Sequence, residues 1–222
     1  MQILDNPITR SVIAKGMMVA ISFTAFIMPV CAGTINATAI NKSGEVMPDV
    51  VVYATRLGGP ATSASGKEAT TIAQDHLQFT PYVTVVQLGS EIKFPNYDKV
   101  EHHVKSFSTA KEFEIKPYEK TTPPPILFDK SGIVVIYCLI HEWMRAYVMV
   151  VDTPYFGKSD TTGAVSLSSL PPGNYEIRAW HPDMGSIKQP LLQTVKVDEQ
   201  GAQAVKFNFD FIPKKRKSGS AG

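Results

Sequence analysis

The sequence predicts an all-β protein, and three observations support this prediction. Apolar and polar residues alternate with a period of two, as in residues 34–40 and 50–54. Turn-forming residues separate such segments, for example at residues 41–44 and at Gly89. Prolines recur in residues 113–128, and because proline cannot donate to a sheet ladder, they indicate short edge strands joined by extended loops.

The first 32 residues differ from the rest and predict an export signal. Arg10 and Lys15 precede the apolar run 17–30, and Val30-Cys31-Ala32 offers small residues for cleavage. The apolar run has about 14 residues, fewer than the roughly 20 needed to span a bilayer. We therefore expect a periplasmic or otherwise exported protein with no stable membrane insertion after cleavage.

Removal of the leader would leave Cys138 as the single cysteine of the mature chain, since Cys31 lies in the leader. Paired cysteines are normally oxidised to disulfides in exported proteins, so a lone thiol needs protection. Ligation of a metal would provide it, because the metal keeps the sulfur deprotonated and occupied. A buried, inert cysteine is the alternative.

The charge balance argues against nucleic acid as a partner. The formal net charge of +2 falls to about +1 when Asp5, Arg10 and Lys15 leave with the leader. The one basic cluster, residues 214–217, belongs to a tail, residues 213–222, that we expect to be disordered, with docking to an acidic partner as the alternative.

The chemistry-bearing motif is Cys138-Leu139-Ile140-His141-Glu142-Trp143-Met144, directly after the apolar run 133–137, which predicts a buried strand. A thiolate, an imidazole and a thioether are each separated by two residues. Cysteine and histidine suit copper in both oxidation states, and methionine adds a weak axial contact. The motif predicts a copper site with Cys138, His141 and Met144 as ligands.

A second histidine ligand is needed, and His102 and His103 are the upstream candidates. Neighbouring side chains on a strand face opposite ways, so both cannot reach one ion without a bend. His76 and His181 have no partner at metal-ligand spacing, and we expect them to be surface or structural residues.

Residues 77–152 resemble the cupredoxins, small blue-copper β-sandwich proteins. The spacing of Phe94 and Asn96 before His102 is similar to plastocyanin, and the short loop from Cys138 to Met144 is similar to amicyanin. The resemblance implies a Greek-key sandwich and one copper ion (Cu+/Cu2+). Its implied ligands are His102, Cys138, His141 and Met144. His103, the rival to His102, stands where many cupredoxins have an asparagine that joins the two ligand loops.

The resemblance also implies a function. It predicts an exported type 1 blue-copper protein that carries single electrons between transient protein donors and acceptors, with amine oxidation as a source of electrons. The alternatives are a copper-binding or copper-delivery protein without a redox partner, and a structural or adhesion module. We expect no enzyme activity, because a nucleophilic cysteine needs a base oriented by a third group and no acidic residue is suggested for that role.

The remaining sequence predicts a second, smaller sandwich. Residues 159–178 resemble the carboxypeptidase regulatory-like domain, a transthyretin-like or Ig-like β-sandwich, and residues 41–53 resemble the opening of the same domain. The hypothesis is a discontinuous domain with the copper unit inserted in it; the alternative is that the first hairpin extends the cupredoxin sheet. The predicted division is a signal peptide (1–32), a first hairpin (33–57), a linker (58–71), a cupredoxin domain (72–152), the rest of the second sandwich (153–212) and a tail (213–222).

Overall fold

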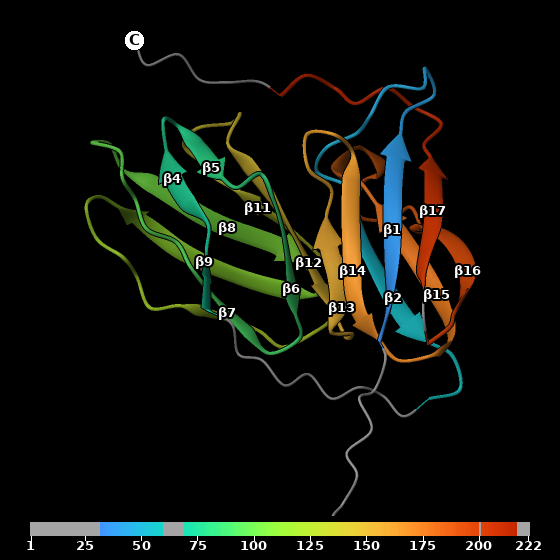
Figure 1. Ribbon diagram of the computed structural model, residues 1–222. Helices are drawn as coiled ribbons and strands as arrows, with labels where there is room; N and C mark the ends of the chain where they lie inside the picture. The colour runs from blue at the N-terminus through green and yellow to red at the C-terminus, as the bar shows by residue number, and fades with distance from the viewer. Residues whose placement is uncertain (1–31, 60–68, 200, 217–222) are drawn as a thin grey trace, which may run out of the picture.

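The computed structural model describes residues 32–59, 69–199 and 201–216, and this part of the chain is built almost entirely of β-strands (Figure 1). The predicted all-β class is confirmed. In the described residues, the one helical element is the short 3-10 helix η1 (Pro182–Met184). No described helix is both long and apolar enough to cross a bilayer. The predicted signal peptide lies outside the described residues except for Ala32.

The strands from the two ends of the chain form one unit, the outer sandwich (residues 33–56 and 155–208), drawn in blue, orange and red in Figure 1. Its strands are β1 (Gly33–Ile40), β2 (Val51–Arg56), β13 (Tyr155–Lys158), β14 (Ala164–Leu170), β15 (Gly173–Trp180), β16 (Leu191–Val197) and β17 (Ala202–Asn208). They form two sheets with the orders β14-β1-β17 and β13-β2-β15-β16. The likeness of this unit to the carboxypeptidase regulatory-like domain stays a prediction.

The prediction that the first two strands form a hairpin is wrong. β1 pairs with β14 and β17, whereas β2 pairs with β13 and β15, so the two strands lie in different sheets. Their apolar side chains, such as Ile35 and Val52, belong to the same buried cluster. The chain changes sheet near Asp49, whose φ is +62°, and Val50 N–H donates to Ser159 Oγ at 2.9 Å. Local alternation indicated two strands but could not indicate which neighbours they pair with.

The middle of the chain forms the inserted sandwich (residues 69–151), green to yellow in Figure 1. Its strands are β3 (Ala69–Thr71), β4 (Ala73–Asp75), β5 (Gln78–Thr80), β6 (Val83–Gln87), β7 (Ser90–Lys93), β8 (His102–Ser108), β9 (Lys111–Tyr118), β10 (Ile126–Phe128), β11 (Gly132–Tyr137) and β12 (Arg145–Val151). A five-stranded sheet of order β6-β12-β11-β8-β9 packs on a three-stranded sheet of order β10-β7-β3, and β4 and β5 form a separate hairpin.

Two predicted boundary segments need correction. The end of the predicted linker 58–71 is the strand β3, which pairs in parallel with β7 and places Thr70 beside Ile92; residues 60–68 lie outside the described part. The predicted disordered tail begins with ordered contacts: Lys214 N–H donates to Asp183 Oδ2 at 2.7 Å, and the Arg216 guanidinium lies 4.5 Å from the centre of the Tyr82 ring. These partners, distant in sequence, hold residues 213–216 against the molecule.

Within the five-stranded sheet, β11 and β12 are buried on both faces because the outer sandwich covers their outward side, whereas the outward face of β8 and β9 is partly exposed. Val134 and Ile136 of β11 point into the core of the inserted sandwich, whereas Val135 belongs to the core cluster of the outer sandwich. β12 alternates in the same way, with Val148 on the inner side and Met149 on the outer side. Burial on both faces explains why these strands are apolar at nearly every position. The strand that leads into the metal motif is therefore packed on both sides.

This layering predicts that Met149 is a core residue even though it faces away from the interior of the inserted sandwich. It is 3% exposed, so we expect Met149→Ala to lower the free energy of unfolding by about 2–5 kcal/mol, through lost burial and the cavity left behind. Chemical denaturation measures the change. The control is Ile187→Ala, at a side chain that is 92% exposed, which we expect to change stability by less than about 0.5 kcal/mol. A Met149 variant as stable as this control would contradict the layering.

Candidate metal centre

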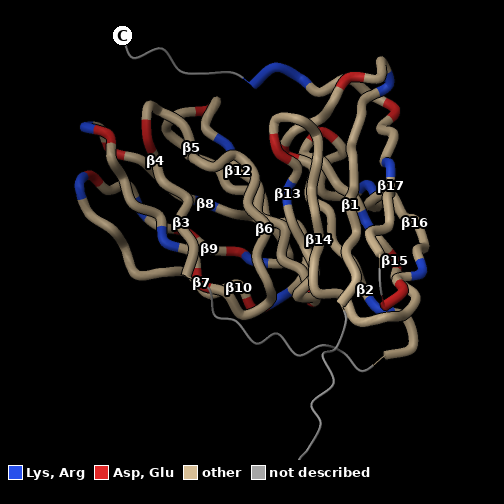
Figure 2. The backbone as a smooth tube through the Cα atoms, viewed as in Figure 1, with Lys and Arg blue, Asp and Glu red and all other residues tan. Residues whose placement is uncertain are grey.

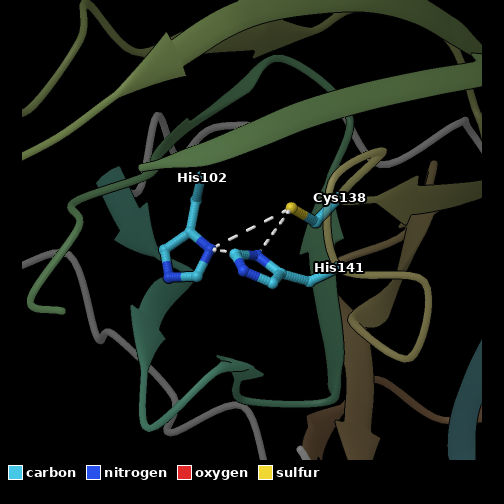
Figure 3. Close-up of side chains that lie close together, drawn as sticks. All are labelled: His102, Cys138 and His141. Atoms are coloured by element: carbon cyan, nitrogen blue, oxygen red, sulfur yellow. Dashed lines mark hydrogen bonds between the residues drawn. The ribbon is translucent and has the colours of Figure 1, made fainter. Parts of the chain in front are cut away.

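Three predicted ligands converge at one end of the five-stranded sheet (Figure 3). His102 is the first residue of β8, Cys138 directly follows the last residue of β11, and His141 lies in the turn between β11 and β12. Because β8 and β11 are antiparallel neighbours, the beginning of one strand lies beside the end of the other. The sheet topology thus brings His102 to the cysteine across 36 residues of sequence.

The donor atoms are spaced as ligands of one metal ion. The Cys138 Sγ atom lies 4.0 Å from His102 Nδ1 and 3.6 Å from His141 Nδ1, and the two nitrogens are 3.1 Å apart. Two atoms bonded to one ion can be separated by at most the sum of their bond lengths, about 4.1 Å for two nitrogens and about 4.4 Å for nitrogen and sulfur around a zinc-sized ion. All three separations satisfy this limit.

The surroundings of Cys138 favour a thiolate. The side chain is buried, and its Sγ accepts a hydrogen bond from the backbone N–H of His103 at 3.4 Å. Burial raises the pKa of the thiol, but hydrogen bonds from His102 and from the backbone N–H groups of His103, Ile140 and His141 outweigh burial and hold that pKa below its usual value. A thiolate is the form of cysteine that binds metals.

A carboxylate fixes the orientation of the His102 ring. His102 is fully buried, and its Nε2 lies 2.8 Å from Asp98 Oδ2, which leaves Nδ1 to face Cys138 and His141. Burial lowers the pKa of His102, but hydrogen bonds to Cys138 and Asp98 raise it more, so the net shift is upward. Metal-binding histidines commonly donate a hydrogen bond from their second ring N–H to such a carboxylate, which fixes the tautomer.

The structure separates His102 from its neighbour His103. The His103 imidazole lies outside the donor cluster, with Nε2 2.9 Å from Glu114 Oε1, while only its backbone N–H reaches the cysteine sulfur. The opposite facing of adjacent strand residues accounts for this division. His103 thus supplies the cluster with a backbone donor, and its ring is tied to β9.

Met144 closes the short turn that carries the other ligands. Its backbone N–H donates to His141 O at 2.9 Å, and its carbonyl accepts the N–H of Cys138 at 3.2 Å. Its side chain is fully buried in the same apolar cluster as Cys138. The role of Met144 as an axial ligand stays a prediction, and the burial of its side chain beside the cysteine is compatible with it.

Asp98 and the turn at residues 76–77 contribute to the site, and sequence reasoning assigned neither a role. The backbone N–H groups of His76 and Leu77 donate to the Asp98 carboxylate at 2.9 and 3.0 Å. The Leu77 carbonyl accepts the indole N–H of Trp143 at 3.0 Å. One turn of the β4–β5 hairpin therefore braces both ligand-bearing loops. The one signal in the sequence is an aspartate four residues before His102.

The remaining histidines lie apart from the donor cluster, as expected. The His76 side chain is exposed and pairs with Asp75, with 3.0 Å between His76 Nδ1 and Asp75 Oδ1. His181 is buried in the outer sandwich, where its Nδ1 accepts the N–H of Asp183 at 3.2 Å. Both are structural or surface residues in this arrangement.

The chemistry of the donors favours copper. Two imidazole nitrogens and one thiolate form the trigonal set of blue-copper centres, completed by a weak methionine contact, whereas structural zinc takes four strong ligands. In the described residues, His102, Cys138 and His141 are the only cluster of three or more such side chains close enough to share an ion.

Solved structures that this fold resembles include cupredoxins. They include a proline-to-glycine variant of amicyanin in its reduced Cu(I) form at pH 4, which is 16% identical with a TM-score of 0.35 and covers 45% of this chain and 99% of that one. A purple cupredoxin from Nitrosopumilus maritimus is 22% identical with a TM-score of 0.33 and covers 38% of this chain and 100% of that one. No protein-family model and no curated protein matches the sequence. At such identities the likeness concerns the arrangement of strands alone.

The contact between Asp98 and His102 makes a testable prediction about metal affinity. We expect Asp98→Ala to weaken Cu(II) binding by about 10- to 100-fold, because the His102 ring loses the partner that orients it. Asp98→Asn, which can still accept a hydrogen bond, should lose less. Competition with a chelator of known affinity measures the change. The control is Asp129→Ala, which removes an exposed carboxylate that pairs with Lys111. This control should bind Cu(II) like the parent protein. Equal losses of copper affinity in the Asp98 and Asp129 variants would contradict the orienting role of Asp98.

Proposed function

We propose that this protein is an exported type 1 copper protein that carries single electrons between redox partners and catalyses no reaction of its own. The observation that carries the proposal is the convergence of His102, Cys138 and His141 from two separate segments onto one ion-sized space. One bound copper ion would supply a one-electron couple. The role of the chain would be to hold the donors in nearly the same place in both oxidation states.

The structure supports such rigidity. The strand β11, which directly precedes Cys138, is packed on both faces, and the two ligand loops are hydrogen-bonded to the same hairpin turn. The ligand turn is closed by backbone bonds between Cys138, His141 and Met144. Donors that do not have to move on a change of oxidation state favour fast electron transfer.

The surface beside His141 offers a place for brief contact with a partner. Leu139 and Ile140, in the turn that carries His141, are 51% and 50% exposed. The His141 ring lies 5.5 Å from the Trp143 ring, measured between centres. A small apolar surface around a half-buried ligand suits transient redox encounters, which bury less than about 1,200 Å² in total. We propose that electrons enter and leave the site here.

The cellular setting is part of the same proposal. The leader indicates export, to the periplasm in a bacterium with two membranes, and Cys138 is the only cysteine that would remain after its removal. A metal-bound thiolate is protected from oxidation in such a compartment. The resemblance of the Cys138–Met144 loop to amicyanin favours oxidation of methylamine or another amine as the source of electrons, which an oxidase or dehydrogenase partner would supply.

Optical spectroscopy of the copper-loaded protein tests this function. We expect an intense visible band from charge transfer between the Cys138 sulfur and Cu(II), which bleaches reversibly on one-electron reduction. Cys138→Ser and His102→Ala should abolish the band. His103→Ala should retain it, because the contribution of His103 to the sulfur comes from its backbone N–H.

Two results would contradict the proposal. Colourless protein with labile copper would favour a delivery role without electron transfer. Loss of the band in the His103 variant together with its retention in the His102 variant would show that the neighbouring histidine is the ligand.

A further inference from the structure

A cleft of about 520 Å³ lies where the two sandwiches meet, beside the ligand turn. We name it the junction cleft. Its lining includes Trp143 and Arg145 from the inserted sandwich, and Asp183 and residues 214–216 from the outer sandwich and the segment that follows it. This volume is in the range of small-molecule sites, which often lie between domains.

The lining of the junction cleft is predominantly cationic. Its charged side chains are those of Arg145, Lys214, Lys215, Arg216, Glu142 and Asp183. Four cations and two carboxylates line the cleft, a formal charge of +2, and Asp49, outside the lining, pairs with one of the four cations, with 3.6 Å between Arg216 Nη2 and Asp49 Oδ2. Asp183 already accepts the backbone N–H of Lys214. Figure 2 shows the basic segment running across this end of the molecule, between the two sandwiches.

Two of the cations are held in place by aromatic rings. The Arg145 guanidinium lies 5.0 Å from the centre of the Tyr137 ring, and that of Arg216 lies 4.5 Å from the centre of the Tyr82 ring. A hydrogen bond with Tyr147 helps to raise the pKa of Arg145, and burial raises the pKa of Tyr82, so both groups remain hydrogen-bond donors at neutral pH. Preorganised guanidinium groups match the planar oxygen pairs of carboxylates and phosphates.

We propose that the junction cleft binds a small oxyanion, such as a phosphate or a polycarboxylate, between Arg145 on one wall and residues 214–216 on the other. The cations line a recess, which favours a small anion over the flat surface of an acidic protein. This site is separate from the proposed copper site. Because Glu142 and Trp143 belong to the ligand turn, a bound anion would contact the structure that holds His141.

Isothermal titration calorimetry of the purified protein, with and without copper, tests the proposal, with inorganic phosphate and citrate as probes at constant ionic strength. We expect saturable binding at one site. Lys214→Gln/Lys215→Gln should weaken it by at least about tenfold, a loss of about 1.4 kcal/mol. The matched control, Lys196→Gln/Lys206→Gln, removes two cations that do not line the cleft and should leave affinity unchanged.

Trp143 provides a local readout, because it lines the cleft whereas the other tryptophan, Trp180, is fully buried. The anion should change its fluorescence in the parent and control proteins but not in the Lys214/Lys215 variant at the same concentration. Absence of saturable binding of both probes, or equal weakening in the control, would overturn the proposal. Because binding is measured without copper as well, failure of the electron-carrier function would leave this test intact.

Discussion

The antiparallel pairing of β8 with β11 is the constraint on which the site depends. The pairing joins Tyr137 to Lys105 and so places the first residue of β8 beside the residue that follows β11. His102 is thereby held by the ladder of the sheet, Cys138 directly follows the paired strand and is hydrogen-bonded to Met144, and His141 lies in the turn. Holding three donor side chains close enough to share one ion is unfavourable without a scaffold, because ordering each side chain costs conformational entropy.

The two sandwiches make this scaffold stiffer than either could alone. An isolated sandwich would leave the outward face of the five-stranded sheet in water, but here Val135, Tyr147 and Met149 pack into the core of the outer sandwich. The ends of the inserted unit connect to β2 and β13, which are themselves paired. The chain therefore leaves and re-enters the outer sandwich at adjacent strands, which explains how a whole unit is accommodated between them.

The ligand turn could be predicted from sequence because its information is local. Cys138, His141 and Met144 lie within seven residues, and their types already specify a soft metal. The choice of His102 over His103 needed family spacing as well, because both residues fit the local pattern. Only the structure shows that the His102 ring joins the cluster, whereas the His103 ring contacts Glu114.

The features that the sequence did not predict correctly are contacts between residues that lie far apart in the chain. The alternation of β1 and β2 correctly indicated strands, but the partners of β1 lie more than 120 residues away, and the nearby β2 is not among them. The brace from Leu77 to Trp143 spans 66 residues and uses a backbone carbonyl, which every residue carries. The last segment of the described chain, residues 213–216, has a basic sequence that predicts a solvated tail; its ordering comes from contacts with Asp183 and Tyr82.

X-ray absorption at the copper edge of the loaded protein tests the central claim most directly, because it separates sulfur from lighter neighbours of the metal, gives their distances and recognises imidazole rings. The account predicts one short sulfur bond from Cys138 and two nitrogen bonds from His102 and His141. A spectrum with only oxygen and nitrogen neighbours, or with a single imidazole, would contradict it.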